Sequence, residues 1–221
     1  MNKNPKNIQK MFDNISSIYD ITNNIISLGL HKYIKKIAIK SCGDIKGKVL
    51  DLCTGTGDIA SLLNDKCDVT GLDFSTKMLE IALKKYPNIP FVEGDCTNLP
   101  FEDNSFDAVT ISFGLRNIEN YHLALDEIFR ILKPNGYFFH LDFGKSNILI
   151  NSIFKYITLF ATSFLYKNNN AYKYLINSKE KFFNKNELIS IFERHNLKLV
   201  KEKSFIFGII SFQLCQKKIN N

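Results

Sequence analysis

The run from Lys48 to Asp73 constrains the fold more than any other part of the chain. It reads KVLDLCTGTGDIASLLNDKCDVTGLD: an apolar run from Val49 to Leu52, a turn with Gly55 and Gly57, a short helical pattern, and a second apolar run that ends on Asp73. Short apolar runs of this kind are typical of buried parallel strands. The glycines permit a tight strand-to-helix turn. The run therefore predicts a βαβ unit and an α/β fold.

The turn and the acidic residue of this unit predict a ligand that carries a nucleoside. A glycine turn lets a ligand approach the backbone, and a carboxylate at the end of the second strand suits the hydroxyls of a ribose. The third glycine of the dinucleotide fingerprint is missing, because Ile59 and Ala60 stand where it would fall. Loss of the pyrophosphate spacing favours a cofactor with adenosine and no phosphates, S-adenosylmethionine, over NAD and FAD.

Length and charge limit the classes of partner. A chain of 221 residues is long enough for one well-packed α/β domain. The net charge is +7, but the lysines are scattered and form no dense basic arm. A solvated basic surface is therefore favoured, and no nucleic-acid partner is expected. A weak attraction to anionic lipid stays open.

The cysteines and histidines are dispersed along the chain. The five cysteines stand at positions 42, 53, 67, 96 and 215 and form no CxxC pair, and the four histidines form no cluster. This pattern favours a reducing compartment and argues against a disulfide framework or a metal site. The N-terminal run MNKNPKNIQK has no apolar signal core, and no apolar stretch is long enough to span a bilayer. We expect a cytoplasmic protein that is at most peripheral at the membrane surface.

Two amphipathic segments precede the first strand, at residues 7–20 and 23–40, and Gly29 and His31 interrupt the second. They lie outside the βαβ core, so they either cap a cleft or cover a face of the sheet. We expect a single domain, residues 1–221, in which an N-terminal helical cap (1–41) precedes a Rossmann-like core (46–221).

The rest of the chain continues the alternation of strands and helices. Expected strands cover 89–92, 106–113, 137–143, 197–207 and 209–217, and expected helices cover 76–86 after an N-cap at Ser75, 123–132, the apolar segment 147–166, and 185–195 after a cap at Asn184. Residues 133–136 predict a tight turn, residues 167–170 predict a loop, and residues 175–183 are ambiguous.

Several of these runs resemble one family of enzymes. LDLCTGTGDIA, GLDFSTKML, GDCTNLPFEDNSFD, TISFGLRN and RILKPNG, together with the N-terminal MFDNISSIYDITNNIISLGLHKYIKK, are similar to the ubiquinone/menaquinone biosynthesis C-methyltransferases, which are class I enzymes dependent on S-adenosylmethionine. The resemblance covers nearly the whole chain and implies a seven-stranded, mostly parallel sheet whose last strand is antiparallel. Departures occur at residues 141–146, where the family has an LEFSKP-like stretch, at Tyr33 and Ile34, where it has a tryptophan, and over 147–170.

The resemblance implies C-methylation of a prenylated quinol, with demethylmenaquinol, in menaquinone biosynthesis, as the favoured acceptor. The polyprenyl benzoquinol of ubiquinone biosynthesis and another small aromatic or lipophilic acceptor are alternatives. A non-catalytic nucleoside-binding module is a remote third, suggested only by the basic charge. The apolar N-terminal helices and the segment 147–166 are candidates for a prenyl channel and a peripheral membrane face, with core packing as the competing interpretation. A homodimer is left open.

Ligands in open α/β sheets sit at the carboxyl ends of the strands, which predicts the cofactor site. Thr56 and the amides of the turn, Gly55 and Gly57 included, would hold the methionine part, and Asp73 would accept both ribose hydroxyls. Asp95 and the Cys96 amide would meet the adenine, and Ser112 would line the methionyl side. The resemblance points to the same positions. As alternatives, Asp73 serves only as a charge at a helix N-terminus, and Thr56 only forms the turn.

The candidates for the chemistry follow the fourth strand. A quinol carbon becomes nucleophilic when the adjacent hydroxyl loses its proton, and phenols titrate near pH 10, so a base or a cation is needed. Arg116 and Asn117 are candidates for holding the phenolate, with the guanidinium as a fixed positive charge. The candidate bases are His31 and Asp142, then Tyr19. His31 could equally be a packing histidine, and Asp142 could cap the helix that follows.

Overall fold

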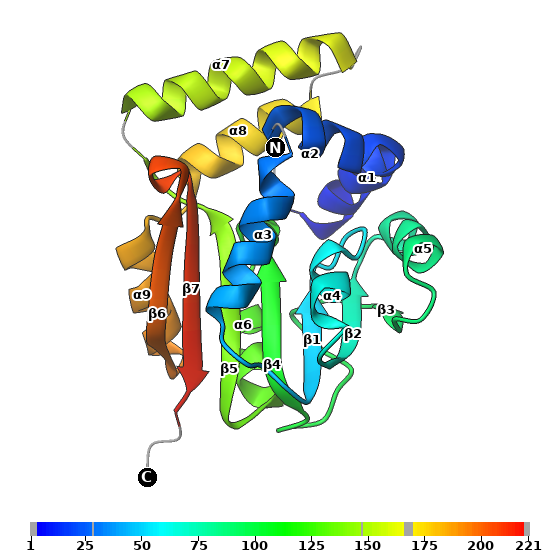
Figure 1. Ribbon diagram of the computed structural model, residues 1–221, viewed down its shortest axis with the longest axis vertical. Coiled ribbons are helices and arrows are strands. Elements are labelled where there is room, and N and C mark those ends of the chain that lie inside the picture. Colours follow the sequence, from blue (N-terminus) through cyan, green and yellow to red (C-terminus); the bar gives the residue numbers. More distant parts are fainter. Residues whose placement is uncertain (1–3, 28, 147, 166–169, 219–221) are drawn as a thin grey trace.

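The computed structural model describes residues 4–27, 29–146, 148–165 and 170–218. Its centre is a seven-stranded sheet in the order β3-β2-β1-β4-β5-β7-β6 (Figure 1). The strands are β1 Lys48–Leu52, β2 Asp68–Asp73, β3 Phe91–Glu93, β4 Phe106–Ser112, β5 Leu132–Phe143, β6 Leu197–Phe205 and β7 Ile210–Lys217. The first five run parallel, while β7 is antiparallel to both β5 and β6. The expected seven-stranded, mostly parallel sheet is confirmed.

Helices connect the strands and cover both faces of the sheet. They are α1 Pro5–Ile15, η1 Ser16–Ile18, α2 Tyr19–Ser27, α3 Leu30–Ser41, α4 Asp58–Leu63, α5 Thr76–Lys85, η2 Leu115–Asn117, α6 Tyr121–Ile131, α7 Ile148–Leu165, α8 Asn170–Lys181, α9 Lys185–Arg194 and η3 Ile206–Gly208. Two expected caps are present: the Ser75 side chain accepts from the Met78 amide, and Asn184 forms a capping box with Glu187. Within the described residues, no helix has both the length and the apolar character that crossing a membrane requires.

Successive side chains of each strand point to opposite faces of the sheet and pack into two hydrophobic cores, one on each face. Leu50 and Leu52 of β1 join the core under α6 and α9, whereas Val49 joins the core under α4. The α3 helix covers β5 and β7 on the face that also carries α4, where Ile34 and Ala38 pack against the two strands. The nearly continuous apolar character of β1 and β4 thus reflects burial on both faces.

One end of the sheet carries a second layer of helices. The carboxyl ends of the parallel strands face α1, α2 and α8, and α7 lies across this layer at the top of the view (Figure 1). The α2 helix packs against α7, and α1 packs against α8. The N-terminal segments are expected either to cap a cleft or to cover a face of the sheet. The structure shows one of each kind: α3 covers a face of the sheet, and α1 and α2 cover the edge where the strands end.

Some element boundaries differ from the expected ones, each for a local reason. The segment 7–20 is not one helix, because α1 gives way to the single turn η1 before α2 begins. The segment 23–40 is split at Gly29, whose φ of +76° ends one helix and precedes the next. The ambiguous residues 175–183 belong mostly to α8, while most of the expected loop 167–170 lies outside the described residues.

The expected tight turn at residues 133–136 lies inside β5. Leu132 already pairs with Phe106, and Tyr137 pairs with Ala108, so the partner strand advances two residues while β5 advances five. Asn135 within this interval has a φ of +62°. Residues 133–136 therefore do bend the chain, but they form an irregularity within β5 and do not separate a helix from a strand.

Candidate functional site

A cavity of about 230 Å³ lies at the carboxyl ends of β1 to β4; we call it the strand-end cavity. Five of the seven predicted cofactor residues line it: Gly55, Asp73, Asp95, Cys96 and Ser112. They come from four strand ends that are far apart in the sequence, as the parallel order of the sheet requires. The α1 helix contributes apolar side chains to the opposite wall, Pro5, Ile8 and Phe12 among them.

Asp73 is held rigidly in this cavity. Its Oδ2 accepts from the Gly55 amide at 2.8 Å, and its Oδ1 accepts from the Ser75 amide at 2.9 Å. Burial raises the pKa of the Asp73 carboxyl to about 6. Each carboxylate oxygen keeps a lone pair, so the group can still accept from two further donors. Because Ser75 is the N-cap of α5, Asp73 also serves the start of that helix, and the two interpretations of this residue do not exclude each other.

The remaining lining residues fit a nucleoside with an amino-acid tail. The Asp95 side chain accepts from the Thr97 amide at 2.8 Å, which fixes its direction. The Ser112 hydroxyl is buried and has no hydrogen-bond partner among the described residues, so it is free for a ligand. Gly55 has a φ of +56° and open space where a side chain would project, so a ligand can approach the backbone there.

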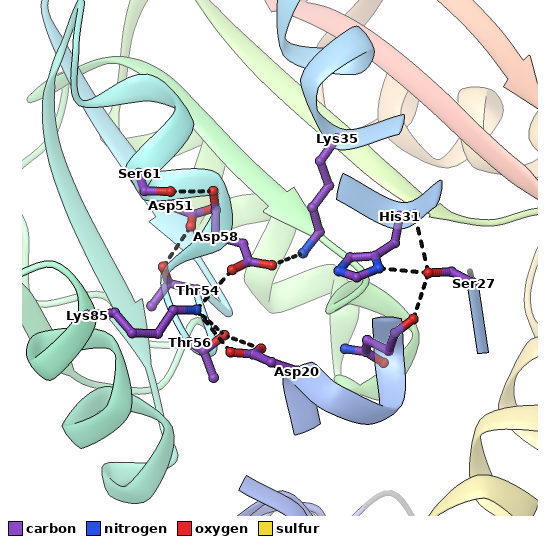
Figure 2. A network of polar contacts seen from close by, with 11 residues as sticks. Asp20, Ser27, His31, Lys35, Asp51, Thr54, Thr56, Asp58, Ser61 and Lys85 are labelled. Carbon is purple, nitrogen blue, oxygen red and sulfur yellow. Dashed lines mark hydrogen bonds and ion pairs between the residues drawn. The ribbon is translucent and has the colours of Figure 1, made fainter. Parts of the chain in front are cut away.

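Thr56 lies outside the strand-end cavity. Its hydroxyl donates to Asp20 Oδ1 of α2 at 2.8 Å, and Lys85 of α5 bridges Asp20 Oδ2 at 3.0 Å and Asp58 Oδ1 at 3.2 Å (Figure 2). Lys35 of α3 completes the set with a 3.0 Å ion pair to Asp58. This cap network ties the N-terminal helices to the glycine turn. The sequence predicts that Thr56 holds the methionine part of the cofactor, and this stays a prediction; in the structure its hydroxyl donates to Asp20 of the cap.

Gly57 also lies outside the cavity and serves the turn. Its φ is +84°, and a side chain there would come within 2.9 Å of the Tyr86 ring and 3.1 Å of the Phe91 ring. The second glycine of the motif is therefore required by the packing of α4 against its neighbours.

A second cavity, of about 440 Å³, adjoins the first; we call it the apolar cavity. Side chains of α1, α3, α7 and η3 form most of its wall, Met11, Ile34, Ile153, Phe154 and Phe207 among them. Four residues line both cavities: Phe12, Tyr19, Phe113 and Asn117. A group bound in the strand-end cavity would therefore lie next to the apolar cavity.

Arg116 places a positive charge in the wall of the apolar cavity. It is 5% exposed, and its Nη1 donates to Asp142 Oδ1 at 2.7 Å and to the Phe113 carbonyl at 2.5 Å. The guanidinium also lies over the Phe143 ring, 5.0 Å from its centroid. Asn117 lies beside it on η2, and its side-chain oxygen is buried without a described partner.

Asp142 lies behind Arg116 and does not line either cavity. It is fully buried and accepts from Arg116 and from the Phe143 amide. Its Oδ1 is engaged by Arg116 and by the Phe143 amide, whereas α7 begins six residues later along the chain. The geometry therefore fits a residue that positions Arg116 better than a helix cap.

His31 lines the apolar cavity, where its Nδ1 lies 2.7 Å from the Ser27 hydroxyl (Figure 2). Burial lowers the pKa of His31 to about 4, so the ring is neutral near pH 7 and is a weak base. The third candidate base, Tyr19, lines both cavities. The structure thus brings Tyr19 closer to the junction of the cavities than His31.

Tyr174 of α8 is the residue that the sequence interpretation missed. It lines the apolar cavity, is 8% exposed, and its hydroxyl has no partner among the described residues. It lies in a segment whose polar and apolar residues follow no clear period, next to residues left ambiguous. Nothing in its local sequence distinguishes it from a core tyrosine.

Comparison with known proteins agrees with this architecture. A family model described as the ubiE/COQ5 methyltransferase family matches residues 1–217. Two relatives, the demethylmenaquinone methyltransferases of Staphylococcus aureus strains MRSA252 and JH9, are each 38% identical to the chain over 231 aligned residues, which cover 99% of this chain and 96% of each relative.

Solved structures are similar in fold. A SAM-dependent methyltransferase from Thermotoga maritima superposes with a TM-score of 0.70 at 19% identity, over 96% of this chain and 100% of that one. A second, from Aquifex aeolicus, has a TM-score of 0.62 at 17% identity, over 83% and 89%. The expected class I methyltransferase fold is confirmed, and the protein belongs to the ubiE/COQ5 methyltransferase family.

Proposed function

We propose that this protein transfers a methyl group from S-adenosylmethionine to a ring carbon of demethylmenaquinol, in menaquinone biosynthesis. One observation carries the proposal: a cavity lined by four strand ends shares a wall with a larger apolar cavity, and Tyr19, Phe113 and Asn117 belong to both. The relatives named demethylmenaquinone methyltransferase support this choice of acceptor.

The strand-end cavity supplies the groups that a nucleoside requires. Asp73 would accept from the ribose hydroxyls, Asp95 from the adenine amino group, and the Cys96 amide would donate to a ring nitrogen. Ser112, whose hydroxyl has no described partner, and the open backbone at Gly55 would meet the amino-acid part. When bound, S-adenosylmethionine supplies an already activated methyl group, whose transfer to the ring carbon leaves S-adenosylhomocysteine and one proton. The protein has mainly to align the two reactants.

Arg116 would stabilise the acceptor as a phenolate. Its charge lies in an apolar wall, where a fixed cation acts more strongly than in water. Asp142 fixes its direction through the 2.7 Å ion pair. Since His31 is a weak base, the phenolic proton would leave by way of Tyr19 or water, and Asn117 would hold the ring at the junction.

The face around α7 would dock on the membrane that holds the prenylated quinol. Leu149, Ile153, Tyr156 and Ile157 of α7 and Phe207 of η3 are each at least half exposed and form what we call the exposed apolar face. Ile153, Ile157 and Phe207 also line the apolar cavity, so the exposed face continues into the interior. A surface of this kind partitions into the lipid interface, from which a prenyl tail could enter directly.

The direct experiment supplies S-adenosylmethionine labelled in its methyl group together with demethylmenaquinol or a polyprenyl benzoquinol. The proposal predicts label in the ring carbon of the naphthoquinol. Transfer only to the benzoquinol would assign the protein to ubiquinone biosynthesis instead, and binding of the cofactor without transfer to any acceptor would contradict an enzymatic role.

A further inference from the structure

Tyr174 occupies the same end of the apolar cavity as Arg116. The α8 helix packs against η2, the single turn that carries Arg116 and Asn117. The charges of Arg116 and Asp142 both act on the Tyr174 hydroxyl. A phenol from one element and a guanidinium from another therefore line one cavity, whose wall is otherwise mostly apolar.

Several polar atoms near this end have no hydrogen-bond partner among the described residues. The Tyr174 hydroxyl, Arg116 Nε, the side-chain oxygen of Asn117 and Asp142 Oδ2 are all buried, and none has a hydrogen-bond partner among the described residues. Buried polar atoms are paired in the great majority of cases, and an unpaired one costs free energy. Of these atoms, the donors of Tyr174 and Arg116 belong to residues that line the apolar cavity, which indicates a ligand with an acceptor oxygen of its own.

The phenol acts there as a donor. Burial raises the pKa of Tyr174, so the hydroxyl keeps its proton at neutral pH and can donate it to an oxygen. A quinol presents two ring oxygens, and the one that becomes a phenolate accepts hydrogen bonds strongly. Because α8 packs against η2 and both side chains line the apolar cavity, a ring oxygen bound at this end could accept from both.

We propose that the Tyr174 hydroxyl donates a hydrogen bond to a ring oxygen of the acceptor and, together with Arg116, sets the orientation of the ring. This inference rests on the proposed function, because it assumes a quinol in the apolar cavity. It assigns a binding role to a residue of α8, an element that lies outside the strand ends that hold the cofactor.

The test is Tyr174→Phe, which removes only the hydroxyl, with Tyr137→Phe as the matched control. Tyr137 lies in the middle of β5, pairs with Ala108, is exposed and lines neither cavity. We expect kcat/KM for demethylmenaquinol to fall about 10- to 100-fold in Tyr174→Phe, the range expected for a hydrogen bond to a charged group. The dissociation constant of S-adenosylmethionine should stay within about twofold in both variants.

The melting temperature of the free protein distinguishes a ligand contact from a structural role. Removal of a hydroxyl that stabilises the fold would lower it. Because the hydroxyl has no partner before the acceptor binds, Tyr174→Phe should leave the melting temperature unchanged or raise it. Two monohydroxy analogues, each lacking one ring oxygen of the quinol, identify which oxygen Tyr174 contacts. With the analogue that lacks the contacted oxygen, Tyr174→Phe and the wild type should have equal kcat/KM.

Unchanged kcat/KM in Tyr174→Phe would overturn the inference, as would a lower melting temperature with the same relative loss for every acceptor. Wild-type protein that transfers no methyl group to demethylmenaquinol would instead contradict the proposed function, so the two failures are distinguishable.

Discussion

The guanidinium of Arg116 and the carboxylate of Asp142 form a buried ion pair, with Nη1 2.7 Å from Oδ1. The first residue follows β4 and lines the apolar cavity, while the second stands near the end of β5, behind it. Two neighbouring strands thus place the Arg116 charge in the wall of the cavity and the Asp142 carboxylate behind it, where it fixes the guanidinium. A buried pair of this kind adds little to the net stability of the protein. Removal of one partner nevertheless destabilises the protein strongly, because the other charge is left buried and unpaired.

Asp142→Asn should therefore lower both stability and turnover. Leaving Arg116 buried without its counter-charge costs about 3 kcal/mol of the free energy of unfolding, measured in urea. The double variant Arg116→Met with Asp142→Leu should regain most of that stability, because no charge is left unpaired, and should still fail to turn over. A double variant that recovers turnover would remove the pair from the mechanism.

The affinity for S-adenosylmethionine should depend on pH through Asp73. Burial raises the pKa of this carboxyl to about 6 in the free protein, and the ribose hydroxyls require the ionised form as acceptor. Binding therefore favours loss of the proton, so the dissociation constant should be constant above pH 7 and rise as the pH falls through about 6. Calorimetric titration from pH 5 to pH 8 measures it.

Asp73→Asn is the control for that assignment. It should weaken binding at least about tenfold at pH 7.5, since charge-assisted hydrogen bonds are the stronger ones, and flatten the pH dependence. Asp51 also has its pKa raised by burial to about 6, but it accepts from Thr54 and Thr110 and does not line the strand-end cavity. If Asp51→Asn flattened the profile while Asp73→Asn did not, the ribose role of Asp73 would be wrong.

The cap network should hold α1 and α2 over the cofactor. Lys85→Met removes the cation that links Asp20 to Asp58, and partly exposed pairs are worth about 1 kcal/mol or less, so global stability should hardly change. Amide hydrogen exchange in α1 and α2 should become faster, and cofactor affinity should fall a few-fold because Phe12 and Tyr19 line the cavity. Lys46→Met, which breaks an exposed pair with Asp44, is the matched control and should change neither.

The exposed apolar face should bind lipid. The double variant Leu149→Ser with Tyr156→Ser removes two side chains that are 70% and 73% exposed and do not line either cavity. Burial of large apolar side chains stabilises by about 1.5–3 kcal/mol each, so partition into phosphatidylglycerol vesicles should fall at least about tenfold by flotation. Turnover of a short-chain acceptor in solution should not change.

Leu83→Ser is the control for the lipid experiment, because Leu83 is 53% exposed on α5, away from α7 (Figure 1). Equal loss of flotation in the control, or wild-type protein that stays in the soluble fraction, would count against docking through α7.

The sequence predicts the strand ends well because their signals are local. The apolar runs before Asp73, before Asp95 and over 106–113 fix approximately where each strand stops, and the parallel order then brings Asp73, Asp95 and Ser112 to one edge. The engagement of Thr56 with Asp20 could not be predicted, since it joins residues 36 positions apart through the packing of α2. The same holds for His31, whose low pKa comes from burial that only the fold creates.

The most direct measurement is a crystal structure of the protein with S-adenosylhomocysteine. The account predicts the adenine beside Asp95 and Cys96, the ribose hydroxyls on Asp73, and the sulfur turned toward Asn117 and the apolar cavity. Density for this ligand in any other part of the molecule, or a sulfur that faces away from the apolar cavity, would contradict it.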